Sequence, residues 1–336
     1  MFMMRFDMRA PATGAPAPDL YAAALEMSAW AERLGCVSVV VSEHHGSEDG
    51  FLPSPLILAG AIAARTSTLP ITVAVVILPL RDPVRLAEEM AVLDVMSRGR
   101  VMYVAGLGYR PVEYEMYGVD FQRRGRIADD TLQVLLKAKT GEPFDLDGRR
   151  VQITPPPVTG GGPMIAWGGG SLAAARRAGR NGIGFFAQGG APTLAEEYSR
   201  AARAAGHEPG LCFIPAADTP TTVFVAEDVD AAWDELGPYL MHDVLTYAAW
   251  NPPGTGTAGL SAATNADELR SEGRSHRILS VPEAIDMIQN GGLPALHPLV
   301  GGLPPDLAWR YLHVLADRVL PAAGAGHRPP SPREDP

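Results

Sequence analysis

A glutamate and two histidines, Glu43-His44-His45, stand directly after three consecutive valines. The valines at 39–41 predict a buried strand, so the polar run lies where that strand ends. Successive side chains on a strand point to opposite faces, so only one of the two imidazole rings can face a given site squarely. This spacing disfavours a zinc site and suits one histidine that transfers a proton near neutral pH. A rim histidine that only hydrogen-bonds to the backbone would leave the same pattern.

Two glycine-rich segments follow other predicted strands. In Gly168-Gly169-Gly170-Ser171, three glycines precede a serine at a helix start, where backbone N–H groups form a cradle suited to phosphate. A flexible connector is the alternative for this segment. Gly106-Leu107-Gly108 is weaker, because it is equally typical of a plain turn. Neither segment has the Walker A lysine or the Rossmann glycine spacing. An arginine cluster before a helix, Arg123, Arg124 and Arg126, offers one side chain that could reach a phosphate.

Other side chains are candidates for a substrate pocket, although each could equally be structural. These are Tyr109, Trp250 and His297. The histidines outside the first run lack the His-x-His or His-Glu-x-x-His spacing of metal sites, so we expect no metal. They include His207, His242, His276, His297 and His313.

The composition limits the partners and the compartment. The net charge is −10 and no basic run occurs, so we expect no nucleic acid partner. No apolar run approaches the roughly 18 residues of a membrane span, and the N-terminus lacks the apolar core of a signal peptide. The cysteines, Cys36 and Cys212, form no redox or metal motif. We therefore expect a cytoplasmic protein without a membrane partner.

Eight short apolar runs, each followed by a helical pattern, predict the scaffold that positions these residues. The predicted strands are residues 3–9, 36–42, 71–78, 100–105, 163–167, 182–186, 221–226 and 293–299. The predicted helices are residues 19–34, 53–65, 82–97, 123–139, 171–178, 193–205, 229–248 and 306–320, with a further helical run ending near 277. Asp19 and Asp82 are the expected N-caps of the first and third helices. Eight such pairs predict an α/β fold, a (β/α)₈ TIM barrel, with a doubly wound sheet as the alternative.

The barrel is expected to form one domain over residues 1–320. Insertions are expected at about 107–122, 141–160 and 249–280, the second of them holding a hairpin that turns at Asp147-Gly148. The Pro/Gly/Ala-rich residues 321–336 predict a disordered tail.

In these residues the chain resembles the luciferase-like flavin monooxygenase family, which also contains deazaflavin-dependent oxidoreductases. The matching stretches are 41–45, 77–89, 93–101, 106–108, 168–171 and 291–303, with the terminal helix. The resemblance covers roughly residues 1–320. The run from Leu78 to Val101 is its most specific part.

The resemblance implies an isoalloxazine ring over the C-terminal mouth of the barrel. His44 matches the histidine that assists chemistry at the flavin, and Glu43 is the second catalytic candidate. The ring would lie beside a non-prolyl cis peptide at Ala74-Val75. The residues implied for cofactor binding are Ala74, Val75, Gly106, Gly108, Arg126, Gly168, Gly169, Gly170 and Ser171. One departure is Leu107, where luciferases carry an arginine; Arg110 or Arg124 would have to compensate.

We therefore expect a flavin-dependent oxidoreductase, in the first place a monooxygenase that uses reduced FMN and O₂ on a small organic substrate. The family implies a separate flavin reductase and a homodimer as partners. Hydride transfer with the deazaflavin coenzyme F-420 on the same fold stays open as an alternative. A further alternative is not an enzyme: a barrel that binds flavin as a carrier or sensor. Such a protein would not require the Glu43-His44 pair.

Overall fold

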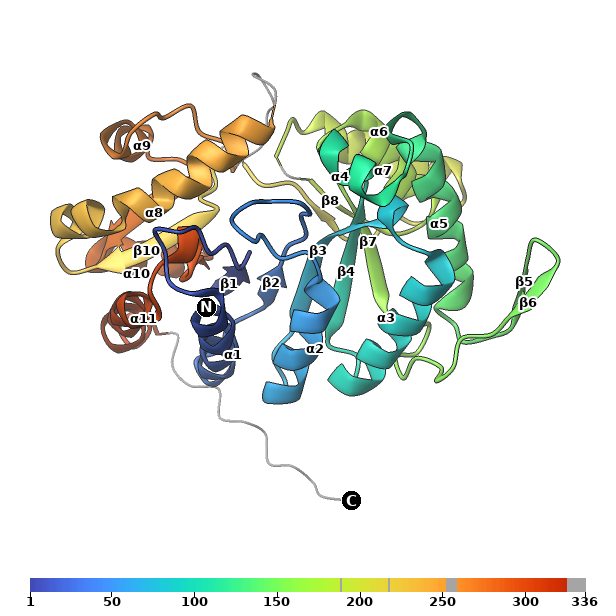
Figure 1. Ribbon diagram of the computed structural model, residues 1–336, viewed down its shortest axis with the longest axis horizontal. Coiled ribbons are helices and arrows are strands. Elements are labelled where there is room, and N and C mark those ends of the chain that lie inside the picture. Colours follow the sequence, from blue (N-terminus) through green and yellow to red (C-terminus); the bar gives the residue numbers. More distant parts are fainter. Residues whose placement is uncertain (188, 217, 252–258, 325–336) are drawn as a thin grey trace, which may run out of the picture.

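The computed structural model describes residues 1–187, 189–216, 218–251 and 259–324. Ten parallel strands form its central sheet, in the order β11-β10-β12-β1-β2-β3-β4-β7-β8-β9, and helices surround this sheet (Figure 1). This confirms the predicted α/β barrel class. Among the described residues, no ladder hydrogen bonds join the two end strands β9 and β11.

The strands and helices have the following bounds. The sheet consists of β1 (Met3–Phe6), β2 (Val39–Val41), β3 (Ile71–Ile77), β4 (Val101–Gly106), β7 (Met164–Gly168), β8 (Gly184–Phe186), β9 (Cys212–Phe213), β10 (Thr222–Ala226), β11 (His276–Ser280) and β12 (Ala295–Leu296). The helices are α1 (Ala17–Arg33), α2 (Pro55–Arg65), α3 (Pro83–Ser97), α4 (Pro111–Tyr117), α5 (Arg124–Ala138), α6 (Leu172–Arg180), α7 (Thr193–Ala204), α8 (Val229–Trp250), α9 (Ala266–Glu272), α10 (Val281–Gln289) and α11 (Pro305–Val314).

Of the two N-cap residues predicted from the sequence, one is confirmed and the other is wrong. Asp82 caps α3 as predicted, because its side chain accepts the Arg85 N–H at 2.8 Å. The prediction that Asp19 caps the first helix is wrong. That helix begins two residues earlier, since Pro18 fits its first turn, and Asp19 lies inside the turn near the positive helix end.

The segment before the last strand departs most from the prediction. The helical run expected to reach residue 277 ends at Glu272, where Gly273 adopts a left-handed φ of 57°. His276–Ser280 is strand β11 instead, paired with β10. Helix α10, which was not predicted, follows with a capping box between Ser280 and Glu283. The start of His276–Ser280 was predicted as part of a helical run, but pairing with the distant strand β10 makes the segment a strand.

Two predicted excursions have structure of their own. The insertion expected after β4, at about 107–122, contains helix α4, which was not predicted. The hairpin near residue 147 is confirmed as β5 (Phe144–Leu146) and β6 (Arg149–Val151), which project from the body (Figure 1). Most of the expected disordered tail, residues 325–336, lies outside the described residues. The single-domain span remains a prediction.

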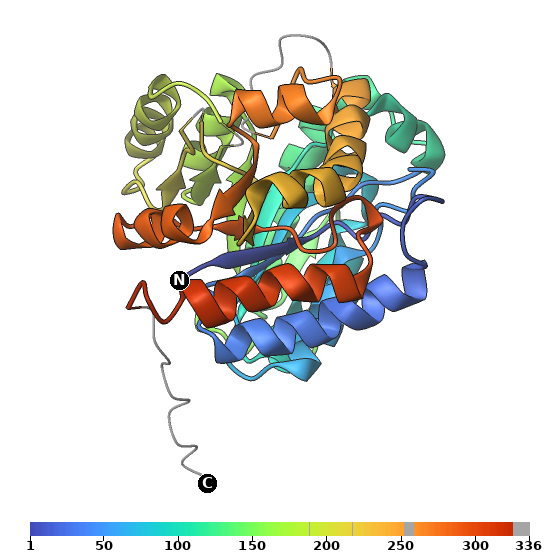
Figure 2. The same cartoon turned by 90° about the vertical axis from the view of Figure 1, so that its left-hand side faces the viewer.

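Helices α1 and α11 run side by side along one flank (Figure 2). Trp30 of α1 and Trp309 of α11 pack edge to face, 5.4 Å between ring centroids. Among the described helices, none combines the length and the apolar character needed to cross a membrane.

Candidate active site

The carboxyl ends of β2, β3, β4 and β7 meet at one edge, because these strands are parallel neighbours. Val75 belongs to β3 and packs against Gly106 of β4 and Gly168 of β7, and the peptide bond Ala74-Val75 is cis, as predicted. A Cβ atom added at Gly106 would lie 3.1 Å from Cβ of Val75, and one at Gly168 would lie 2.9 Å from its Cγ1. These two glycines therefore leave the room that Val75 occupies.

The segment Gly168–Ser171, which we name the glycine corner, joins β7 to α6. Gly169 has a φ of 143°, a backbone conformation that side chains rarely adopt. Ser171 caps α6, since its hydroxyl accepts the Ala174 N–H at 3.2 Å. Gly170 and Ser171 are exposed. The corner thus presents the N-terminal N–H groups of a helix to solvent, which suits an anionic group.

The arginines predicted near this corner differ in how free they are. Arg126 is largely exposed, and among the described residues only Asp130 lies within ion-pair distance, at 3.9 Å. Arg124 stacks on the Phe121 ring and donates to the Phe121 carbonyl at 2.7 Å. Arg110 is buried and committed to the histidine run described next. Arg126 is therefore the one of these three with a guanidinium free to meet a ligand.

His44 is buried at the end of β2, with its ring surrounded by aromatic side chains. Its Nδ1 lies 2.8 Å from Oε1 of Glu113 on α4. Its Nε2 lies 3.5 Å from the Tyr109 hydroxyl. The rings packed around it, with centroids 4.8–6.3 Å away, belong to Phe51, Tyr109, Tyr247 and Trp250. Two predicted pocket residues, Tyr109 and Trp250, are therefore beside His44.

Glu113 is the residue that the sequence analysis missed. Its Oε1 also accepts the His45 backbone N–H at 3.0 Å and Arg110 Nη1 at 3.2 Å. Burial opposes its ionisation, but the hydrogen bond from His44 and the nearby charges hold the pKa of Glu113 below its usual value. No sequence signal separates this glutamate from its exposed neighbour Glu115, because only tertiary contact distinguishes them.

Glu43 and His45 belong to a different set of contacts. Glu43 accepts hydrogen bonds from Arg81 Nη2 at 2.7 Å and from the Ile77 N–H at 3.1 Å. His45 Nε2 lies 2.9 Å from Glu43 Oε1, and its Nδ1 lies 3.1 Å from the Tyr117 hydroxyl. The two histidine rings thus take separate partners, as strand alternation predicts. Glu43 ties the end of β2 to the end of β3.

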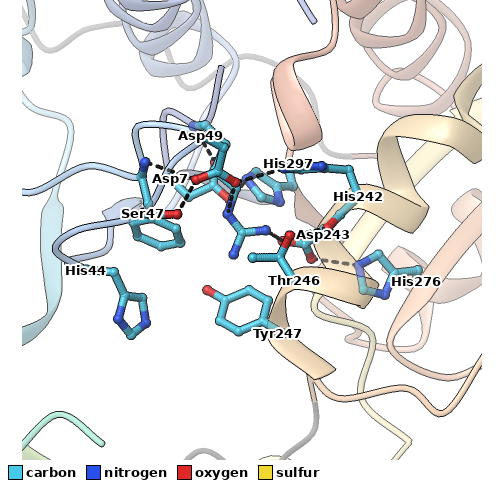
Figure 3. Close-up of polar contacts among 12 residues, drawn as sticks. Asp7, His44, Ser47, Asp49, His242, Asp243, Thr246, Tyr247, His276 and His297 are labelled. Atoms are coloured by element: carbon cyan, nitrogen blue, oxygen red, sulfur yellow. Dashed lines mark hydrogen bonds and ion pairs between the residues drawn. The ribbon is translucent and has the colours of Figure 1, made fainter. Parts of the chain in front are cut away.

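Arg9 is fully buried among three carboxylates, those of Asp7, Asp49 and Asp243, and Figure 3 labels these three residues. It donates to Asp243 at 2.7 Å, and its Nε lies 3.5 Å from Asp7 and 3.6 Å from Asp49. Its guanidinium also lies 4.5 Å from the Tyr247 ring centroid. The buried guanidinium therefore connects the loops after β1 and β2 to helix α8.

Three histidines that are scattered in the sequence meet this arginine cluster. His242 pairs with Asp49 at 2.8 Å and His276 with Asp243 at 2.9 Å. His297, predicted as a pocket residue, is fully buried 3.4 Å from Asp7 instead of lying beside His44. Atoms of Asp7, Asp243 and His297 lie within 4.8 Å of one another, a spacing that a metal could use. Arg9 already places a cation against both carboxylates.

Burial is also the main influence on His44. It lowers the pKa of His44, and the hydrogen bond to Glu113 only partly offsets this effect. The imidazole is therefore neutral near pH 7 and able to accept a proton. The mouth thus combines a proton acceptor, a wall of aromatic rings and, at the glycine corner, a site suited to an anion.

Comparison with known proteins places this arrangement in context. The sequence profile of the luciferase-like monooxygenase family matches residues 2–301. The uncharacterized protein y4vJ of Sinorhizobium fredii is 33% identical over 135 residues, 40% of this chain and 38% of that protein. Such matches span only about two fifths of the length of these curated relatives.

Solved structures resemble the chain over almost its whole length. The monooxygenase RslO1 of Streptomyces bottropensis superposes with a TM-score of 0.73 at 22% identity, over 95% of this chain and 98% of that one. The oxygenating constituent of 3,6-diketocamphane monooxygenase from Pseudomonas putida, in complex with FMN, gives 0.69 at 20%, over 95% and 98%. A coenzyme F-420-dependent secondary alcohol dehydrogenase gives 0.63 at 17%, over 96% and 99%. At these identities the likeness shows the fold.

Proposed function

This chain belongs to the luciferase-like monooxygenase family, and we propose that it is a monooxygenase that uses reduced FMN and O₂ on a small organic substrate. The observation that carries the proposal is the placement of a neutral, buried His44 at the same strand edge as the glycine corner and the cis peptide. A carrier or sensor of flavin would need the anion site but no proton acceptor.

The residues present fit FMN. The glycine corner and Arg126 would hold the phosphate, because the corner offers N–H donors at a helix start and the guanidinium is only weakly paired. Val75, with Gly106 and Gly168 against it, would support the ring system. When bound, reduced FMN supplies the electrons that activate O₂.

The side chains around the ring would then control water and protons. Phe51, Tyr247 and Trp250 form an apolar wall that limits the access of water to the mouth. His44 accepts or returns a proton at Nε2, which faces the Tyr109 hydroxyl. Glu43 keeps the ends of β2 and β3 together, and a direct catalytic role for it stays a prediction.

Cofactor titration tests this function directly. We expect the protein to bind reduced FMN and, on mixing with O₂ in a single turnover, to transfer oxygen to a substrate. Selective binding of reduced coenzyme F-420 would overturn the proposal in favour of hydride transfer, the alternative that shares this fold. Flavin binding without a product from any oxidant or substrate would favour a carrier.

The glycine corner makes a separate prediction about the phosphate. We expect Gly169→Ala to weaken FMN binding about tenfold, because alanine does not adopt the φ of 143° and its Cβ would crowd Ala174. Riboflavin, which lacks the phosphate, should lose much less affinity. Fluorescence titration of both flavins measures the difference.

Gly148→Ala is the matched control, because Gly148 also has a positive φ, of 75°, but lies in the distant hairpin with open space around it. An equal loss of FMN and riboflavin affinity in Gly169→Ala would place the phosphate elsewhere.

Two partners belong to the same proposal. A separate reductase would supply the reduced flavin. A second copy of the chain would cover the neighbouring helices α2 and α3, where Ile57 is 75% exposed and Met96 is 51% exposed. Sedimentation velocity at micromolar concentration tests the homodimer, and a monomer there would contradict it.

A further inference from the structure

We propose that Glu113 is a positioning residue, which holds His44 in the tautomer with a proton on Nδ1 and so leaves Nε2 as the nitrogen that exchanges protons. The importance of this for turnover rests on the function proposed above. The tautomer itself is a property of the protein without cofactor.

The contacts of Glu113 determine which His44 nitrogen carries the proton. An ionised carboxylate only accepts hydrogen bonds, so the Nδ1 that lies 2.8 Å from its Oε1 must donate. The same oxygen accepts the His45 backbone N–H and a guanidinium N–H of Arg110. Three donors converging on one oxygen keep Glu113 ionised and fixed in place.

Arg110 in turn has little freedom. Its guanidinium donates to the His45 carbonyl at 2.8 Å and stacks on the Trp250 ring at 3.9 Å. Helix α4 and the end of β2 are thus joined through both a backbone N–H and a backbone carbonyl of His45. Glu113 therefore approaches His44 from a rigid support, as a positioning role requires.

The other ring nitrogen faces a donor rather than an acceptor. Burial raises the pKa of Tyr109 well above its usual value, so its hydroxyl keeps its proton and can donate toward Nε2. The distance of 3.5 Å is too long for a firm hydrogen bond, so Nε2 is available to a ligand. The charges that face His44 are Glu113, Arg110 and, from the loop after β1, Arg9.

His45 provides an internal contrast. Its Nε2 contacts the carboxylate of Glu43, and its Nδ1 contacts the Tyr117 hydroxyl. The adjacent histidines are therefore held by two different glutamates through opposite nitrogens. We expect His45 to be the Nε2–H tautomer and His44 the Nδ1–H tautomer.

Nitrogen NMR of the full chain labelled with ¹⁵N-histidine tests the inference without any flavin. At pH 7.5, His44, assigned by its loss in His44→Gln, should show a protonated Nδ1 and a bare Nε2. In Glu113→Leu this preference should decrease, and Nε2–H should become populated. An Nε2–H tautomer in the unaltered protein, or no change in a folded Glu113→Leu, would overturn the proposal.

Two further variants separate positioning from packing. Glu113→Gln keeps the shape but removes the charge that favours the imidazolium, so the protonation midpoint of His44 should move to lower pH. Glu113→Asp should retain the Nδ1–H tautomer. Glu115→Gln, on the exposed side of the same helix, is the matched control and should change neither the tautomer nor the protonation midpoint of His44. An unmoved midpoint in Glu113→Gln would contradict the contact.

Kinetics then connects the tautomer to turnover. We expect Glu113→Leu to reduce the oxygenation rate constant about tenfold or more, with Glu113→Asp restoring most of it. If His44→Ala oxygenates normally while the NMR result holds, the proposed role of His44 fails and the positioning by Glu113 stands.

Discussion

Replacing Arg9 by methionine is expected to lower the free energy of unfolding by about 3–5 kcal/mol. The side chain is fully buried and is the cation shared by Asp7, Asp49 and Asp243. Methionine would fill much of the volume but leave these carboxylates without their guanidinium. Since a domain has only about 5–15 kcal/mol of stability in total, the variant should be marginal. Urea unfolding followed by tryptophan fluorescence measures the loss.

The same contact predicts how the loss depends on pH. Although burial opposes ionisation, His297 and Arg9 hold the pKa of Asp7 at about 2, and the pKa of Asp243 is also lowered. In the unfolded chain an aspartate titrates near 3.9, so this stabilisation is complete above about pH 4 and is lost as the pH falls toward 2. In Arg9→Met, the pKa values of both aspartates should rise, because burial would no longer be opposed by the guanidinium. The deficit should therefore be largest near neutral pH and smaller at pH 5.

A surface arginine supplies the control. Arg85 is largely exposed and pairs with Glu88 and Glu89 on its own helix, so Arg85→Met should cost less than about 1 kcal/mol. A comparably small effect of Arg9→Met at pH 7, with an unchanged denaturant slope, would contradict the assigned role of the buried pair.

Local sequence signals were sufficient wherever one element carried its own pattern. The apolar runs of β3 and β4 lie within a residue or two of their predicted bounds, because both faces of a parallel strand are buried and the sequence is continuously hydrophobic. Ser171 and Asp82 were recognised as caps from their position before a helical pattern. The cis peptide at Ala74-Val75 was predicted from the resemblance alone, since valine and alanine give no local signal for it.

Contacts between distant segments could not be predicted in this way. The histidines outside the first run lack metal-like spacing, yet His242, His276 and His297 gather around Arg9 from α8, β11 and the end of β12. Glu113 meets His44 across 69 residues of sequence. A single sequence records spacing along the chain, whereas these contacts follow from the order in which the parallel strands are arranged.

The site residues therefore fall into two groups: those placed by a local sequence motif and those placed by contacts between distant segments. Gly168–Ser171 is a local motif, and the structure gives it the helix cap and backbone conformation expected of an anion site. The partner of His44 lies on helix α4, which is in a segment predicted only as an insertion. Short helices of this kind lack a long enough pattern to be recognised.

His44→Ala is expected to slow oxygen transfer by about 10²–10⁴-fold in single turnover with reduced FMN and O₂, the range typical of a lost general acid or base. Flavin affinity should change little, because the anion site lies at the glycine corner and not at His44. His44→Gln should be similarly slow, since the amide can hydrogen-bond to Glu113 but cannot take up a proton. His207→Ala, on the exposed surface, is the control.

The pH profile distinguishes a proton-transfer role from a packing role for His44. Burial lowers the pKa of His44. The oxygenation rate of the unaltered enzyme should therefore decrease in acid with a midpoint below pH 6.5, the pKa typical of a free imidazole. We call this decrease the acid limb of the pH–rate profile. His44→Ala removes the group and should remove that limb, and added imidazole should restore part of the rate if it enters the space left by the ring. A variant that keeps both the limb and the rate would assign the proton to another group. Because His44 is packed against four aromatic rings, a loss of rate without loss of the limb would instead mean that those rings have rearranged.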